Sequence, residues 1–319
     1  MNSSISFRYM PNFTDGFSTR NLHFHDHSYK NNVVFVMGAT GTGKSRLSID
    51  LAECFNGAVI NSDKMQVYKG LDVVTNKVTE QECKGIPHHL LGFRDPDLDY
   101  TATHFGFDAI NAIESIIQQD KLPIIAGGSN SFIEYLVEYH PSFSSWYHCC
   151  FLWVDVNPSI LEQFVSIRVD RMIEQGFVDE VRGIFCPDAD YKQGVRRAIG
   201  VPEMDSFLRA ERDSDCNPKT LEILLQIAID DVKRNTRTLS HRQRNKIRRL
   251  RELWNWNIHR IDATAAFSMK RMDSRHVWEK QVVNRSKTIV DDFCNTKYPK
   301  NTQHHYDNTH FTPKFLVEA

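Results

Sequence analysis

The fold of this chain is decided by one stretch, Gly38-Ala39-Thr40-Gly41-Thr42-Gly43-Lys44-Ser45. The stretch fits the phosphate-binding pattern G-x-x-x-x-G-K-S. A β-branched and apolar run at 33–37 precedes it and predicts a buried strand. Residues 45–55 follow with apolar side chains at helical spacing. Because the pattern joins a strand to a helix, we interpret it as a phosphate site, not as a chance glycine-rich turn.

Further strands are predicted on both sides of this loop. Short apolar runs at 58–60, 122–126 and 151–154 indicate buried strands, and 257–261 indicates another. Residues 105–119 repeat apolar side chains at helical intervals before the 122–126 strand. Strands that alternate with helices form parallel sheets covered on both faces. We therefore predict an α/β fold, a P-loop NTPase-like parallel sheet flanked by helices with a small helical subdomain.

Ligands of such sheets bind at the carboxyl ends of the strands. The segments at those ends are Gly38–Ser45, Asn61–Gln66, Gly127–Ser131 and Asp155–Asn157. The expected organisation along the chain is a flexible leader at 1–31, a P-loop core at 32–165, a small helical subdomain at 166–229, a helical return to the core with the last strand at 230–294, and a disordered tail at 295–319. Within it, a long helix is predicted over Pro218–Leu253.

Composition limits the class of protein. The 319 residues are 41% hydrophobic and 25% charged, which is typical of a globular chain with a core. A net charge of -1 provides no overall attraction to nucleic acid or to an anionic membrane. No apolar stretch approaches the roughly 18 residues that a membrane span requires. The seven cysteines show no CxxC pair and are expected as reduced thiols.

The P-loop predicts phosphate chemistry without saying which kind. Its backbone N–H groups can surround a phosphate, Lys44 adds a charge, and the Ser45 hydroxyl can reach a magnesium ion. A hydrolysing NTPase normally has a magnesium-binding Asp after a later strand. Here the 122–126 strand ends in Gly127-Gly128-Ser129, although Asp155 follows another strand and could take that role.

Asp63 follows the strand at 58–60 and is expected at the same edge of the sheet as the P-loop. A carboxylate at that place can bind a metal ion, cap a helix, or accept a proton from a nucleophile. Its position alone leaves these three roles open.

Several motifs resemble one family. They are Asn61-Ser62-Asp63-Lys64-Met65-Gln66-Val67-Tyr68-Lys69-Gly70-Leu71-Asp72, Thr75-Asn76-Lys77-Val78, Ile86-Pro87-His88-His89-Leu90-Leu91-Gly92, Ala126-Gly127-Gly128-Ser129-Asn130-Ser131 and Val195-Arg196-Arg197-Ala198-Ile199-Gly200-Val201-Pro202-Glu203. Together, and in this order, they resemble the isopentenyltransferase family over about 33–293.

The resemblance also separates two branches of that family. Enzymes acting on tRNA tend to have Ala-Asp-Ser where this chain has Ser62-Asp63-Lys64, and Gly-Gly-Thr-Gly-Leu-Tyr where it has 127–132. Eukaryotic tRNA enzymes commonly add a Cys2His2 zinc finger. Here Cys294 stands alone before His304, His305 and His310, which predicts no zinc site. The chain is more similar to plant adenylate isopentenyltransferases, so tRNA is not the favoured substrate. One departure is Arg237, where plant members more often have Lys.

The resemblance implies a reaction. A dimethylallyl group passes from dimethylallyl diphosphate to N6 of a free adenine nucleotide, ATP, ADP or AMP, which is the first step of cytokinin synthesis. It implies that Asp63 takes the N6 proton, and that Lys44, Thr40, Ser45 with Mg²⁺, and Arg237 stabilise the departing diphosphate. The residues expected to bind diphosphate or nucleotide are Gly38, Ala39, Thr40, Gly41, Thr42, Gly43, Lys44, Ser45, Gln66, Ser129, Arg168, Arg171, Arg242 and Gln243.

Two charged segments each have a functional and a structural interpretation. The run 233–251 holds nine Lys and Arg, and we expect one edge to face the diphosphate, through Arg237, Arg242 and Gln243, while the rest is solvated. Arg168 and Arg171 stand three residues apart on a predicted helix. They could clamp phosphates, or form an ordinary surface salt-bridge ladder with Glu162 and Glu174.

Alternative functions are a tRNA dimethylallyltransferase, a P-loop small-molecule kinase, and a non-enzymatic nucleotide switch. We expect the chain to act as a monomer. Residues 1–31 are rich in Ser, Asn, Phe and His and contain few acids, which is compatible with a transit peptide. The expected location is the plastid, with the cytoplasm as the alternative.

Overall fold

The computed structural model describes residues 29–268 and 271–298. Its centre is a six-stranded sheet in the order β3-β2-β4-β1-β5-β6, in which all neighbouring strands are parallel. The strands are β1 (Asn31–Gly38), β2 (Gly57–Asn61), β3 (His88–His89), β4 (Leu122–Ala126), β5 (Tyr147–Asp155) and β6 (Ile258–Asp262). β1 lies between β4 and β5, and its residues from Val33 onward are buried. This part of the strand is covered on both faces, and it is an apolar run that ends in glycine.

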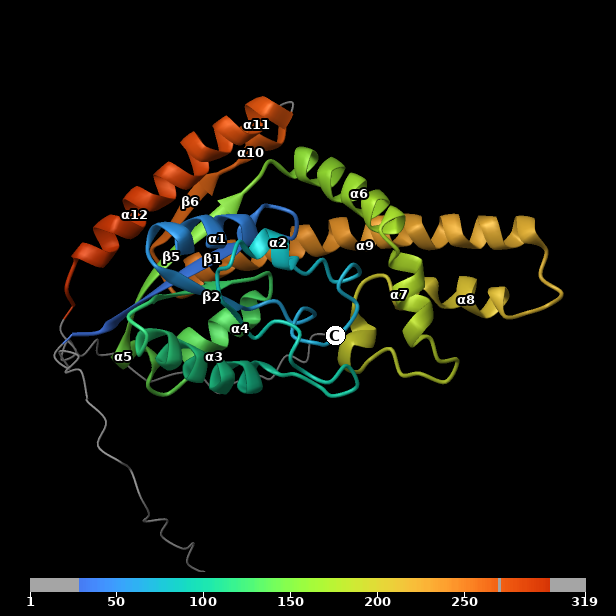
Figure 1. Cartoon of the computed structure of the whole chain (residues 1–319), viewed down its shortest axis with the longest axis horizontal. Coiled ribbons are helices and arrows are strands. Elements are labelled where there is room, and N and C mark those ends of the chain that lie inside the picture. The colour runs from blue at the N-terminus through green and yellow to red at the C-terminus, as the bar shows by residue number, and fades with distance from the viewer. Residues whose placement is uncertain (1–28, 269–270, 299–319) are drawn as a thin grey trace, which may run out of the picture.

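Helices cover both faces of the sheet (Figure 1). Val34 and Val36 of β1 pack on one side with α1 (Lys44–Cys54), while Val33, Phe35 and Met37 pack on the other. The first side is completed by α10 (Thr264–Ser268), α11 (Arg271–Trp278), η4 (Glu279–Val283) and α12 (Asn284–Asn295). The second side is covered by α3 (Ala102–Ile117), α4 (Asn130–Glu134), η1 (Tyr135–Tyr139) and α5 (Phe143–Trp146).

Most of the remaining helices extend beyond the sheet, whereas the second half of α9 (Pro218–Leu253) packs on it (Figure 1). These remaining helices are α6 (Pro158–Glu174), α7 (Phe177–Ile184), η2 (Gly194–Arg197), η3 (Pro202–Met204), α8 (Asp205–Glu211) and α9, and the short α2 (Glu80–Cys83) lies in the loop after β2. Both long helices begin alike, with an Asn cap and a Pro at the first helical position.

Helices α6 and α9 pack antiparallel. Lys233 of α9 pairs with Asp170 at 2.5 Å, and two turns later His241 meets Glu162 at 2.7 Å. The 36-residue α9 therefore runs back alongside α6 toward the carboxyl ends of the strands. This return brings its second half against the P-loop.

The predicted sheet is confirmed, and so are the predicted strands and the bounds of α9. The additional strand β3 has only two residues, both His, and carries no apolar run that a pattern could detect. The structure also describes residues 29–31 and 295–298, where the Lys30 N–H donates to the Tyr298 carbonyl at 2.9 Å. The rest of the expected leader and tail, 1–28 and 299–319, lies outside the described residues. In the described part of the chain, no helix is long and apolar enough to cross a membrane.

Candidate functional site

The P-loop joins β1 to α1 and rests on a tryptophan. Gly43 is the N-cap of α1 with φ 89°, and a Cβ there would lie 2.5 Å from the ring of Trp278. Only glycine combines this φ with that close approach. Trp278 is buried, and its indole N–H donates to Asp50 at 3.1 Å. The ring thus packs against one side of the loop, and the opposite side is left for a phosphate.

Lys44 lies inside this loop. Its ammonium donates to the Ala39 carbonyl at 2.7 Å, and the Thr42 hydroxyl donates to the same oxygen at 2.9 Å. Burial lowers the pKa of Lys44 to about 8, against the opposing effect of Asp63 and with a smaller contribution from Arg168. A buried ammonium without a carboxylate bonded to it is stabilised when an anion binds.

Arg168 of α6 provides a second cation at the same place. Its guanidinium donates to the Thr40 hydroxyl at 2.9 Å, while its buried Nε has no hydrogen-bond partner among the described residues. Burial lowers the pKa of Arg168 to about 10, and the Asp63 carboxylate opposes that shift. A buried cation, Lys44, and a partly buried one, Arg168, therefore face one carboxylate, which leaves a net positive site for a diphosphate.

Asp63 lies in the loop that follows β2. Its Oδ1 accepts the Met65 N–H at 3.0 Å, so one carboxylate oxygen caps a turn, although no helix begins there. None of the described hydrogen bonds uses Oδ2. The Ser129 hydroxyl, in the turn between β4 and α4, holds the loop by accepting the Lys64 N–H at 2.8 Å. Asp63 is thus anchored by one oxygen and offers the other to the site.

Gln243 of α9 connects the two sides of the site. Its Oε1 accepts the Thr40 N–H of the P-loop at 2.7 Å, and its Nε2 donates to the Gly128 carbonyl at 3.0 Å. A Cβ on Gly128 would lie 2.4 Å from Gln243 Nε2 and 3.3 Å from Asp63 Oδ2. Gly128 therefore lies between Gln243 and Asp63, and it leaves no room for a larger residue.

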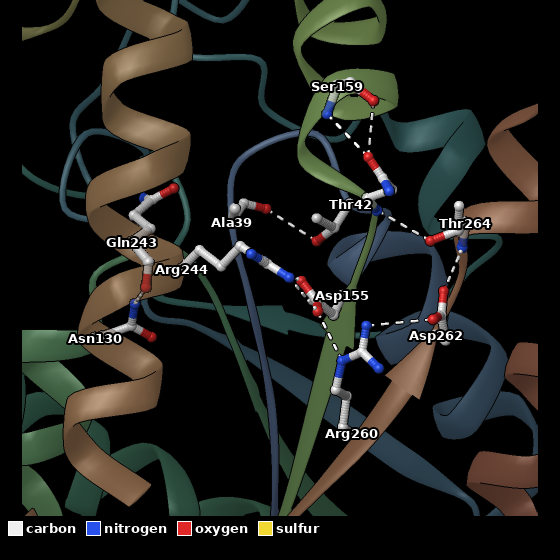
Figure 2. A network of polar contacts seen from close by, with 11 residues as sticks. Ala39, Thr42, Asn130, Asp155, Ser159, Gln243, Arg244, Arg260, Asp262 and Thr264 are labelled. Carbon is white, nitrogen blue, oxygen red and sulfur yellow. Dashed lines mark hydrogen bonds and ion pairs between the residues drawn. The ribbon is translucent and has the colours of Figure 1, made fainter. Parts of the chain in front are cut away.

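Asp155 at the end of β5 is bound to arginines (Figure 2). Arg244 contacts both of its oxygens, at 2.8 and 3.0 Å, and Arg260 contacts Oδ2 at 2.7 Å. The carboxylate is almost fully buried. It lies where a hydrolysing NTPase would hold magnesium, but its charge is already neutralised by two guanidinium groups. The magnesium role left open for Asp155 is therefore not supported.

The other expected site residues do not all contact the P-loop. Arg237 lies on α9 with its guanidinium 3.4 Å from the Ser166 hydroxyl, facing α6. Gln66 holds its own loop together, because its amide donates to the Thr75 and Asn76 carbonyls at 3.1 and 3.0 Å. Arg171 and Arg242 are exposed, and no described hydrogen bond or ion pair joins them to the P-loop. The structure thus brings Arg168 to the site without Arg171.

The alternative of a salt-bridge ladder on α6 is not found among the described residues, because Glu162 pairs with His241 and not with Arg168. Three contributors were not predicted: Trp278 beneath the loop, Arg244 on Asp155, and Asn130, whose amide donates to the Gln243 carbonyl at 3.2 Å. Each acts through a partner far away in the sequence. Arg242, Gln243 and Arg244 are three consecutive polar residues on one helix. Their sequence alone does not indicate which of these side chains faces inward.

The donor set fits a divalent cation that is held mainly by the substrate. The Ser45 side chain is exposed at the first turn of α1, and Asp63 Oδ2 is available across the site. The described residues contain no group of three or more His, Cys, Asp or Glu that could hold a metal ion alone. A magnesium-like ion keeps several waters and binds through one or two protein oxygens and the substrate phosphates.

Comparisons with known proteins agree on one family. The family model described as IPP transferase matches residues 66–145 and 137–250. Adenylate isopentenyltransferase 5, chloroplastic, from Arabidopsis thaliana is 54% identical over 266 residues, which is 83% of this chain and 80% of the relative. Adenylate isopentenyltransferase 7, mitochondrial, from the same plant is 51% identical and covers 83% and 81%.

A solved structure is similar at lower identity. It belongs to a eukaryotic dimethylallyltransferase acting on tRNA, is 26% identical, and superposes with a TM-score of 0.68. The match covers 86% of this chain and 82% of that protein. The P-loop sheet with its appended helices is thus shared across both substrate classes.

Proposed function

This chain belongs to the IPP transferase family, and we propose that it transfers the dimethylallyl group of dimethylallyl diphosphate to N6 of a free adenine nucleotide, releasing diphosphate. It is a prenyltransferase of cytokinin biosynthesis. The observation that carries the proposal is the meeting of Lys44, Arg168 and Asp63 around one P-loop. Two cations suit the departing diphosphate, and one carboxylate suits the attacking amine.

The donor is held by its diphosphate. P-loop amides, Lys44 and Arg168 would surround the phosphate oxygens, with Arg237 contributing from α9. These groups stabilise the negative charge that develops as the allylic C–O bond breaks. We infer that the divalent ion is magnesium, which would bind the Ser45 hydroxyl and the phosphate oxygens and offset part of that charge.

The acceptor is activated by Asp63. The lone pair of an exocyclic adenine amine is delocalised into the ring, which makes the amine a poor nucleophile. Asp63 Oδ2 would accept the N6 hydrogen bond, so that one proton passes to the carboxylate while the new N6–C bond forms. The Oδ1 bond to the Met65 N–H holds the carboxylate in one orientation during this transfer.

Two alternatives predict different products. A small-molecule kinase would release ADP from ATP, whereas the proposed transfer leaves the nucleotide phosphates intact. A tRNA enzyme would modify an anticodon stem-loop. The adenylate-named relative is 54% identical, whereas the tRNA-acting structural relative is 26% identical, and this difference favours the free nucleotide.

The experiment is incubation of the purified chain with dimethylallyl diphosphate, magnesium and ATP, ADP, AMP or an anticodon stem-loop. Mass spectrometry of the products should find N6-dimethylallyl adenylate and diphosphate. Product formed only on the stem-loop, or ADP formed from ATP without any prenylated product, would overturn the proposal.

We further propose a plastid location and a monomeric enzyme. The support for the plastid is the word chloroplastic in the name of the 54% identical relative, although the 51% identical relative is named mitochondrial. A monomer is compatible with the direct contacts that the P-loop makes with Arg168 and Gln243 of the same chain. Import into isolated chloroplasts and light scattering of the purified protein test these two points.

A further inference from the structure

The carboxylate of Asp155 forms a buried ion pair that the proposed reaction does not use. Asp155 ends β5, and its side chain is 2% exposed. Arg244 of α9 reaches it with two donors, Nε to one oxygen at 2.8 Å and Nη2 to the other at 3.0 Å. Arg260 of β6 also donates to Oδ2, at 2.7 Å (Figure 2). Asp155 therefore joins the carboxyl end of β5 to the second half of α9.

The contact with Asp155 fixes the direction of Arg244 as well as its distance. Two parallel bonds from a guanidinium to a carboxylate hold both groups in one plane, whereas an ammonium makes a point contact that can rotate. Asp155 belongs to a strand that is paired along its length with β1 and β6. Arg244 is only 15% exposed, so its planar group is held against a rigid strand. The pair thereby fixes the rotation of α9 at residue 244.

Gln243 directly precedes Arg244 on α9. Consecutive residues of an α-helix point about 100° apart, because one turn contains 3.6 residues. The direction of Arg244 therefore sets that of Gln243. Gln243 makes the two bonds that cross the candidate site, accepting the Thr40 N–H at 2.7 Å and donating to the Gly128 carbonyl at 3.0 Å. Rotation of α9 would move both atoms of this amide away from their partners.

Other polar contacts near this turn of α9 are single. The Asn130 amide donates to the Gln243 carbonyl at 3.2 Å, and the Lys246 ammonium pairs with Glu134 at 2.6 Å. Lys246 stands two residues after Arg244, which places it on the opposite face of the helix. These point contacts hold α9 near α4, but they do not restrict its rotation as a bidentate pair does.

Stability alone does not account for the Asp155–Arg244 pair. Taking two charges out of water costs roughly what their attraction returns, so a buried ion pair is often no more stable than apolar residues of similar volume. We propose that Asp155 is a positioning residue of the transfer reaction, which acts through Arg244 to hold Gln243 between the P-loop and the Asp63 loop. This inference rests on the proposed function and gives a part in it to a carboxylate whose oxygens are both bonded to arginines.

The test is Arg244→Lys, which keeps a positive charge for Asp155 but removes the bidentate contact. The value of kcat should fall about threefold to thirtyfold, up to the loss from deleting both Gln243 bonds, with KM for both substrates within about twofold. The double variant with Gln243→Leu should lose less than about twofold more than Gln243→Leu alone, because both changes remove the same bridge.

Asp231→Asn is the matched control. It breaks another carboxylate–guanidinium pair, Asp231 with Arg234 at 2.6 Å, in the first half of the same helix. This pair is more exposed than the Asp155 pair and lies away from Gln243 along α9, so the variant should keep the wild-type kcat.

Amide hydrogen exchange gives a readout that does not depend on turnover. The Thr40 N–H should exchange faster in Arg244→Lys and in Gln243→Leu than in wild type, because it loses its acceptor, while the amides of β1 and β5 keep their protection. Unchanged exchange at Thr40 in Arg244→Lys would overturn the inference. So would an equal loss of kcat from Arg244→Lys with and without Gln243, which would mean a general effect on stability or charge.

A wild-type chain that forms no prenylated adenylate would overturn the proposed function. The exchange of the Thr40 N–H would then decide by itself whether the Asp155–Arg244 pair positions Gln243.

Discussion

The side-chain oxygen of Gln243 accepts the backbone N–H of Thr40 at 2.7 Å, across 203 positions of sequence. A P-loop amide that could otherwise bind a phosphate is thereby hydrogen-bonded to a residue of α9. The same side chain donates to Gly128, beside Asp63. One amide group therefore ties the loop that holds the donor to the loop that holds the proposed base.

We expect Gln243→Leu to lower kcat by up to about thirtyfold, because it removes two hydrogen bonds of about 1 kcal/mol each. Gln243→Glu keeps the oxygen that accepts the Thr40 N–H but loses the N–H that donates to the Gly128 carbonyl. Its added negative charge should also weaken the binding of dimethylallyl diphosphate. Steady-state kinetics on both substrates measure this. Asn245→Leu, at an exposed position of the same helix, should behave as wild type. An unchanged kcat in Gln243→Leu would show that the bridge has no part in turnover.

Lys44 predicts a pH dependence of donor binding. Its pKa is lowered to about 8 in the folded protein, so the free enzyme loses this charge as the pH rises through that value. The value of kcat/KM for dimethylallyl diphosphate should therefore fall above about pH 8, with a slope of one proton. Lys44→Ala should abolish transfer and remove the slope from any residual activity. A profile that stays flat to about pH 10 would place the ammonium outside the mechanism.

The same shift has a consequence for stability. Lys44 binds its proton less tightly in the folded chain than in the unfolded chain, where the ordinary value of 10.5 applies. Between these two values the unfolded state binds more protons, so this group makes the free energy of unfolding rise with pH. Below about pH 8 both states are protonated, and the cost of burying the charge is constant. Comparing the urea unfolding of Lys44→Met and wild type across that window isolates the contribution.

Asp63→Asn should lower turnover by at least about a hundredfold while adenylate affinity stays within a few-fold, because the amide cannot take up the proton. The melting temperature should change little, since the Asn oxygen can still accept the Met65 N–H. Partial rescue by high magnesium or manganese would instead indicate a metal ligand. Turnover near the wild-type rate would remove Asp63 as the general base.

Simultaneous charge reversal at Arg248, Arg249 and Arg251 should leave activity on free adenylates within a few-fold. All three side chains are exposed on α9, beyond the turn that carries Gln243, and exposed charges contribute little to stability. Product formation and circular dichroism on the triple variant test this. A folded but inactive variant would mean that this end of the helix also meets the substrate.

The sequence by itself determined the sheet, the P-loop, the length of α9 and the family. These features depend on local patterns: apolar runs, helical spacing, an Asn-Pro start at 217–218 and motifs in order. It also placed Asp63 and Lys44 at one edge of the sheet, because the carboxyl ends of parallel strands meet there.

Only the tertiary structure decided which member of each charged series faces the site. Arg168 reaches Thr40 and Arg171 does not, because the packing of α6 on α9 sets the rotation of the helix. In the same way Gln243 and Arg244 turn inward while Arg242 stays exposed. Asp155 is pattern-compatible with a magnesium ligand, yet Arg244 and Arg260 lie 89 and 105 positions away in the sequence and neutralise it. Contacts over such separations leave no periodic signal, because they depend on how whole helices dock and not on the residues next to them in the chain.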